Sequence, residues 1–207
     1  MRRRLRWLRL AALGAVGASA ALAAVPAAAQ YSTGYKFLEA VKKKDGQAVT
    51  DALAQPGTTV VNAKDGSSGD TALHLVTARR DVTWIRFLAA KGANVNARNA
   101  KGQTPLQLAT NLGFADGVEE LLKLGARVDE ANSTGETPLI AAVHRRDAAM
   151  ARALLKAGAD PRRNDNSGRS ALDYATLDGR TNPVLAEIEN ASKQARAKAA
   201  PTYGPKL

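Results

Sequence analysis

The feature that most constrains this chain is a sequence repeat of 33 residues. A Gly-x-Thr or Gly-x-Ser triplet begins at residues 69, 102, 135 and 168. A leucine follows each triplet at the same interval, and a Gly-Ala pair recurs in phase at residues 92, 125 and 158. Independent markers in phase over four units indicate a repetitive structure in which each unit packs mainly against its neighbours.

Within each unit the residue pattern predicts two short helices joined by a turn. Thr71 and its equivalents provide a hydroxyl oxygen for the free N–H groups of a first helical turn. Pro105 and Pro138 follow at the first helical position, where the missing N–H costs nothing. The second helix is expected to end at the Gly-Ala glycine, such as Gly92. Helices of about 8–10 residues are marginal alone, so stability must come from stacking.

Three segments of this pattern resemble the ankyrin repeat: residues 71–75, 104–109 and 92–97. The resemblance covers about residues 35–190 and implies an all-α solenoid of stacked helix-turn-helix units with β-hairpin-like loops. We expect a degenerate amino-terminal cap at residues 35–66, repeats at about 67–99, 100–132 and 133–165, a carboxyl-terminal cap at 166–190, and a basic disordered tail at 191–207.

The departures from the repeat pattern carry structural predictions of their own. Arg80 and Arg146 replace the glycine expected between the two helices, which predicts strained turns. Glu120 stands where other units have apolar residues, and it predicts a loosened or exposed layer. In the degenerate first unit, the turn between helices is expected at Asp45-Gly46.

The first 29 residues have the three parts of a secretory signal peptide. Met1–Arg9 is basic, Leu10–Val25 is apolar, and small residues precede a cleavage site predicted after Ala29. The alternative is a membrane anchor. However, the 16 apolar residues would span only about 24 Å, against about 30 Å of hydrocarbon. We therefore expect a periplasmic or secreted protein without a transmembrane anchor after cleavage, exported by the Sec or the twin-arginine route.

The net charge of +11 resembles that of a nucleic-acid-binding protein, but its distribution argues against that class. Five arginines lie in residues 1–29, and four further cations lie in residues 190–207, with no acid in either segment. The body between them therefore carries only about +2. This excess is too small to indicate a DNA- or RNA-binding domain.

The sequence shows no catalytic constellation, and we predict a non-enzymatic protein with no catalytic residue, no cofactor and no metal. It has no cysteine and two histidines. His74 lies in the Thr-x-x-His position, where we expect its ring to bond nearby backbone and the Thr hydroxyl. His144 is expected to make a surface contact. Residues 62–70 contain oxygen ligands but lack the spacing of a calcium loop, which favours a solvated turn.

The ankyrin resemblance implies a scaffold that binds a partner protein through its concave face, formed by the hairpin tips and the exposed ends of the first helices. The partner is expected to present an acidic surface, and the chain to be a monomer. Two alternatives are an envelope-associated protein held by its basic tail and an accessory subunit of an exported enzyme. The predicted partner-binding residues are Lys64, Asp70, Arg79, Arg98, Lys101, Gln103, Asn111, Glu136, His144, Arg145 and Arg169.

Overall fold

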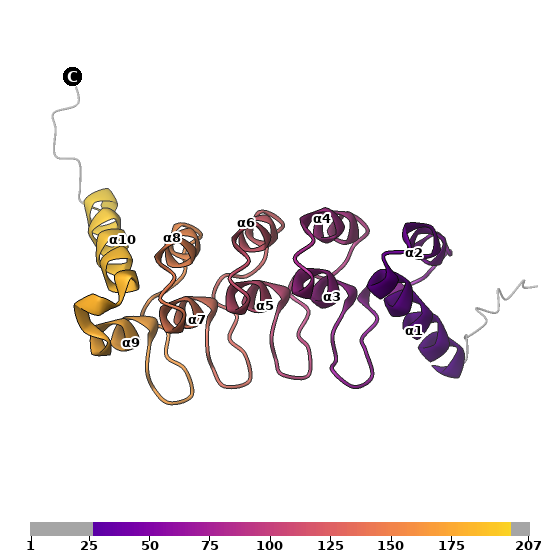
Figure 1. Ribbon diagram of the computed structural model, residues 1–207, viewed down its shortest axis with the longest axis horizontal. Coiled ribbons are helices and arrows are strands. Elements are labelled where there is room, and N and C mark those ends of the chain that lie inside the picture. The colour runs from indigo at the N-terminus through magenta and orange to yellow at the C-terminus, as the bar shows by residue number, and fades with distance from the viewer. Residues whose placement is uncertain (1–26, 200–207) are drawn as a thin grey trace, which may run out of the picture.

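The computed structural model describes residues 27–199. Most of the predicted signal peptide (residues 1–26) and the end of the predicted tail (residues 200–207) lie outside this part. Figure 1 shows two rows of helices with a row of hairpin loops beside them, which is an all-α solenoid. Within residues 27–199 there is no β-strand, and the only β-type pairings are isolated bridges between Lys64 and Thr71 and between Asn164 and Ser170.

The helices alternate between an inner row, next to the hairpins, and an outer row. The inner helices are α1 (Ala27–Lys43), α3 (Ala72–Ala78), α5 (Pro105–Asn111), α7 (Pro138–His144) and α9 (Ala171–Leu177). The outer helices are α2 (Gly46–Leu53), α4 (Val82–Ala90), α6 (Ala115–Lys123), α8 (Ala148–Lys156) and α10 (Pro183–Ala199). Two 3-10 turns, η1 (Val60–Asn62) and η2 (Gly179–Thr181), complete the described elements. None of the helices in residues 27–199 combines the length and apolar character needed to cross a bilayer.

Four hairpins connect successive helix pairs, and we number them by position. The first covers residues 62–71, the second 96–104, the third 129–137 and the fourth 162–170. Each hairpin leads directly into the next inner helix (Figure 1).

Side-chain caps start the helices where the sequence predicted them. The Thr104 hydroxyl accepts a hydrogen bond from the Gln107 amide at 3.3 Å, and Pro105 occupies the first turn. Aspartates cap three of the outer helices, α2, α4 and α8; for example, the Asp147 carboxylate accepts from the Met150 amide at 3.0 Å. Each cap pairs an N–H group that the helix itself leaves free.

One continuous apolar core runs between the two rows of helices. The repeated leucines Leu73, Leu106 and Leu139 are at most 1% exposed. In the last unit the equivalent Leu172 is only partly buried. The core therefore depends on neighbours on both sides, as expected for stacked repeats.

The turns between paired helices contain a residue with positive φ. Arg80 (φ 59°) and Arg146 (φ 54°) adopt this conformation at the positions where the sequence predicted strain. In the first unit the turn lies one residue earlier than predicted, at Lys44-Asp45. Lys44 takes the left-handed conformation (φ 58°), and Gly46 is already the first residue of α2. Asp45 caps that helix through the Ala48 amide, which fixes the helix start one residue after the turn.

Two further expectations need correction. Glu120 neither loosens nor exposes its layer: it is 8% exposed, and its Oε2 accepts a 2.7 Å hydrogen bond from Arg86 on α4. This bond from Arg86 holds the pKa of Glu120 below its usual range. The predicted disordered tail also begins too early, because α10 continues past Asn190 to Ala199.

Candidate partner-binding face

The concave face consists of the four hairpins and the carboxyl-terminal ends of α3, α5, α7 and α9. Its hairpins are joined by backbone hydrogen bonds, one at each junction. The Ala100 amide donates to Ser68 O at 2.9 Å, Ser133 to Lys101 O at 3.2 Å, and Asn166 to Thr134 O at 3.0 Å. Neighbouring hairpins therefore lie at backbone contact distance.

This close approach requires glycine at the hairpin tip. Gly135 has a φ of 80°, and a Cβ atom there would lie 2.5 Å from the Asn166 backbone nitrogen. Gly168 has nearly the same φ, 81°, but a Cβ atom there would meet nothing within 4 Å because no fifth hairpin follows within residues 27–199. At the junctions between hairpins the glycine is needed both for the positive φ and for the close approach of the next backbone. At Gly168, in the last hairpin, only the positive φ favours glycine.

Each of the later tips is closed internally by an Asn or Asp side chain. Asn99 Oδ1 accepts from the amides of Lys101 and Gln103, each at 3.0 Å. Asp165 Oδ1 accepts from the Ser167 hydroxyl at 2.7 Å and from the Ser167 and Arg169 amides. These bonds, led by that from the Ser167 hydroxyl, hold the pKa of Asp165 well below its usual range, so the carboxylate stays charged at neutral pH.

His74 confirms its predicted structural role and extends it. The Thr71 amide donates to His74 Nδ1 at 3.2 Å, so the proton is on Nε2, which donates to Gln103 O at 2.9 Å. The side chain therefore joins its own helix start to the next hairpin. His74 is 1% exposed, and this burial lowers its pKa.

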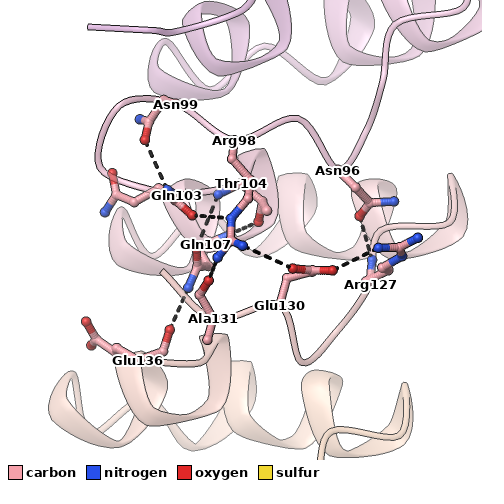
Figure 2. A network of polar contacts seen from close by, with 11 residues as sticks. Asn96, Arg98, Asn99, Gln103, Thr104, Gln107, Arg127, Glu130, Ala131 and Glu136 are labelled. Atoms are coloured by element: carbon pink, nitrogen blue, oxygen red, sulfur yellow. Dashed lines mark hydrogen bonds and ion pairs between the residues drawn. The ribbon is translucent and has the colours of Figure 1, made fainter. Parts of the chain in front are cut away.

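Gln107 makes the same two contacts one repeat further on, as Figure 2 shows. The Thr104 amide donates to Gln107 Oε1 at 3.2 Å, and Gln107 Nε2 donates to Glu136 O at 2.6 Å. The third member of the series is Ile140, which is fully buried and has no polar side-chain atom. No side chain at this position bonds the fourth hairpin, so this series of cross-links ends there.

Two predicted partner-binding arginines, Arg79 and Arg145, bond the ends of neighbouring inner helices, and Arg80 does the same. Arg145, from the following repeat, donates to Asn111 O at 2.9 Å, and Arg80, from the preceding repeat, donates to Leu112 O at 2.6 Å. Arg79 likewise donates to Val41 O at the end of α1. The last carbonyls of a short helix lack partners within the helix, and cations are favoured at that end. These arginines therefore hold adjacent repeats together.

Arg98 also lies between two repeats (Figure 2). It donates to Gly102 O at 3.0 Å and to Ala131 O, and its Nη1 lies 3.9 Å from a Glu130 carboxylate oxygen. Lys64 in turn donates to Arg98 O at 2.8 Å. Both predicted residues are thus tied to the solenoid.

Other predicted partner-binding residues have side chains that make fewer contacts within the solenoid. In the described part of the chain, the Lys101 amino group and the Arg169 guanidinium make no hydrogen bond or ion pair. Arg169 lies over the ring of Tyr174, 5.8 Å from its centre. The Asp70 carboxylate accepts a hydrogen bond from Asn99 Nδ2 at 2.9 Å. Gln103 and Asn111 contribute their backbone carbonyl oxygens, which accept hydrogen bonds from His74 and Arg145.

The carboxyl-terminal half of the face contains a pocket of about 420 Å³ between the third and fourth hairpins. His144 on α7 and Tyr174 on α9 line the pocket, and their rings lie 4.7 Å apart in an edge-to-face arrangement. His144 Nδ1 lies 3.4 Å from Glu136 Oε1, and the Tyr174 hydroxyl donates to Asp165 Oδ2 at 2.7 Å. The structure thus brings the predicted residues Glu136 and His144 together.

Tyr174 and Leu177 were not predicted from the sequence to lie on this face. Leu177 ends α9 at the position equivalent to Asn111 and His144, and it is 73% exposed. Tyr174 stands where the earlier units have Leu108 and Ala141. Comparing the units position by position would have identified both residues, since each breaks the trend of its column.

Side chains that bind metals do not cluster on this face. Over residues 27–199, the structure brings no three histidine or acidic side chains together in the way a metal site requires.

Comparison with protein families agrees with this geometry. A family model described as ankyrin repeats (three copies) matches residues 37–132 and, in a second overlapping alignment, residues 116–189. The chain belongs to the ankyrin-repeat family. Members of this family typically act as non-enzymatic scaffolds for protein–protein interactions. A comparison with curated proteins gave no match.

Proposed function

We propose that this ankyrin-repeat protein is an exported scaffold that binds a partner protein through its concave face. The observation that carries the proposal is a set of side chains on that face that make no hydrogen bond or ion pair within the described part of the solenoid. They include the cations Lys101 and Arg169, and Leu177, whose exposure leaves apolar surface in water. Aromatic residues and arginine next to exposed apolar surface are typical of interface centres.

The proposed partner presents an acidic surface to the second hairpin. Lys101 at its tip has a charge that the fold leaves uncompensated, and Arg98 beside it has only Glu130, at 3.9 Å, as an acidic neighbour. Charges of this kind steer association and raise its salt sensitivity more than they raise affinity. We propose that the scaffold itself is a monomer.

The proposed location is the periplasm or the medium, on the basis of the basic, apolar and small-residue segments of residues 1–29. Intact-mass measurement of the protein purified from a bacterial host tests this directly. Export and cleavage give a chain that begins at Gln30. An uncleaved chain in the membrane fraction would contradict the proposal.

Partner binding is tested by charge reversal at side chains without a structural role. The variant Lys101→Glu should reduce capture of crosslinked partner from the exported fraction about fivefold, because one exposed charge contact is worth up to about 1 kcal/mol. The control is Lys156→Glu, which changes the net charge equally on the outer helix α8.

The two variants separate the concave face from a general charge effect. Equal losses in both would contradict binding through the concave face. Loss of capture only when residues 191–207 are deleted would favour attachment by the basic tail instead. Circular dichroism should stay unchanged in both variants, since surface substitutions usually shift stability by less than about 0.5 kcal/mol.

A further inference from the structure

The pocket between the third and fourth hairpins is formed by residues that occur together only at this junction. Its aromatic wall is Tyr174, whose register holds Leu75, Leu108 or Ala141 in the other units. Its acidic wall is Glu136, where the second hairpin has Gln103. The junction also lacks the bond from an inner helix that His74 and Gln107 provide elsewhere; its side-chain bond runs between the hairpins, from Asn166 Nδ2 to Ser133 O at 3.1 Å. The pocket is therefore specific to one end of the face.

The acids in the pocket retain hydrogen-bonding capacity. Glu136 Oε2 accepts one bond, from Asn132 Nδ2 at 3.2 Å, and Oε1 lies 3.4 Å from His144 Nδ1. Asp165 Oδ1 is occupied by the turn, but Oδ2 accepts only from the Tyr174 hydroxyl. A carboxylate oxygen can accept two hydrogen bonds, so both residues can accept another donor.

The charge balance of the pocket is negative. Glu136 and Asp165 contribute two carboxylates, and Arg169 over the Tyr174 ring contributes one cation. Arg169 is itself close to the carboxylate of Asp173, whose pKa is lowered mainly by its bond from the Ser170 hydroxyl and to a smaller extent by Arg169. The cation next to the pocket is thus partly compensated from outside it.

We infer that this pocket receives one basic side chain, lysine or arginine, of the partner protein. The inference rests on the proposed function and specifies the partner's chemistry at one position. A cation there gains the carboxylates of Glu136 and Asp165 as charge-assisted acceptors. The volume of about 420 Å³ accommodates one such side chain with some water. Leu177, at the end of α9, provides apolar contact for the residue that follows.

This inference complements the acidic surface proposed for the partner. The second hairpin presents the cation Lys101, whereas the pocket between the third and fourth hairpins presents the carboxylate of Glu136. The concave face therefore carries opposite charges at these two places. A partner with acidic groups at one end and a basic residue at the other would bind in one orientation only. Charge arrangements of this kind fix register.

The experiment uses N-acetyl-arginine amide as a probe and N-acetyl-citrulline amide as its neutral isostere. Each is titrated into the ¹⁵N-labelled protein, and the amide shifts of Thr134, Asn166 and Tyr174 are followed. We expect saturable shifts with the arginine probe, with a Kd of about 1 mM for a ligand of this size. The citrulline probe should bind at least about twofold more weakly, the lower end of the range for losing an exposed charge contact.

The matched variants are Glu136→Gln, which keeps the shape of the pocket, and Glu119→Gln on the exposed side of α6. Glu136→Gln should weaken the arginine probe about two- to fivefold, and Glu119→Gln should leave it unchanged. Equal binding of citrulline, preference for N-acetyl-glutamate amide, or no saturable shift would each overturn the inference. None of these results depends on partner capture, so the pocket can fail while binding through the concave face stands.

Discussion

The junction between the second and third hairpins differs from the junction between the third and fourth in what its inner helix contributes. At the earlier junction Gln107 extends from α5 to Glu136 O, whereas at the later one Ile140 of α7 is purely apolar. The outer row of the later junction is firmly joined, since Arg152 donates to Glu187 through both Nε, at 2.9 Å, and Nη2. The difference is therefore confined to the hairpin side, where the pocket lies. One repeat position can serve cohesion in one unit and leave space for a ligand in another.

The largest effect should come from the repeated core leucine. Leu106→Ala should destabilise the protein by about 2–5 kcal/mol, because a buried leucine with neighbours on both sides leaves a cavity. Leu172→Ala, at the same register but only partly buried, should cost clearly less. Urea titration followed by circular dichroism measures both. Equal losses would show that the last unit is packed as tightly as the central ones.

The hairpin glycines provide a closely matched pair. Gly135→Ala combines a positive φ with a Cβ atom 2.5 Å from the next backbone, whereas Gly168→Ala has only the positive φ. Both should lose about 1–2 kcal/mol from backbone strain, and Gly135→Ala should lose about 1–3 kcal/mol more from overpacking. Thermal unfolding would reveal the difference. If the two variants melted together, close hairpin packing would contribute nothing to stability.

Exchanging the residues at the two junctions tests the side-chain cross-link itself. Gln107→Ile removes both the bond to Glu136 O and the bond from the Thr104 amide, and it should cost about 1–3 kcal/mol, because each hydrogen bond has a net value of about 0.5–1.5 kcal/mol. The reverse change, Ile140→Gln, should restore a bond to the fourth hairpin and slow its amide exchange. A gain in exchange rate at the fourth hairpin in Ile140→Gln would contradict this account.

The smallest expected effect is a pH dependence of the first cross-link. Burial lowers the pKa of His74 in the folded state, so the unfolded chain binds more protons as the pH falls below the ordinary value of about 6.5. The stability contributed by neutral His74 is full above that pH and is lost progressively on acidification. His74→Gln should keep both hydrogen bonds, as Gln107 does, and should lack this component. Identical pH profiles of unfolding for the two proteins would exclude it.

The period of 33 residues predicted the solenoid, its helix caps and the left-handed turns at Arg80 and Arg146, because these features depend on local residue chemistry. The contacts between repeats were harder to predict. The sequence showed Glu120 as a misplaced acid because its partner, Arg86, lies one repeat away. For the same reason, Arg79 and Arg145 looked like a surface patch, although they bond helix ends in neighbouring units.

The residues of the candidate site likewise divide into those that the sequence predicted and those that it did not. Glu136 and His144 were predicted from their register, and the structure places them in one pocket with Tyr174. Tyr174 and Leu177 were overlooked because a tyrosine or leucine on a short helix usually indicates core. Only their exposure and neighbours, which depend on the missing fifth hairpin, show that they lie on the concave face.

The central claim is that the fourth hairpin is held less firmly than the third, which leaves a pocket open to a partner. Native-state hydrogen exchange tests it most directly at two equivalent amides, Ser133 and Asn166, each bonded to the preceding hairpin. We predict that Asn166 exchanges about fivefold faster than Ser133 after correction for intrinsic rates, because the fourth hairpin lacks the part-buried bond from an inner helix and has instead an exposed bond from Asn166 Nδ2 to Ser133 O at 3.1 Å. Its bond is the shorter of the two, 3.0 Å against 3.2 Å, so bond length alone predicts the opposite order. Equal or slower exchange at Asn166 would contradict the account.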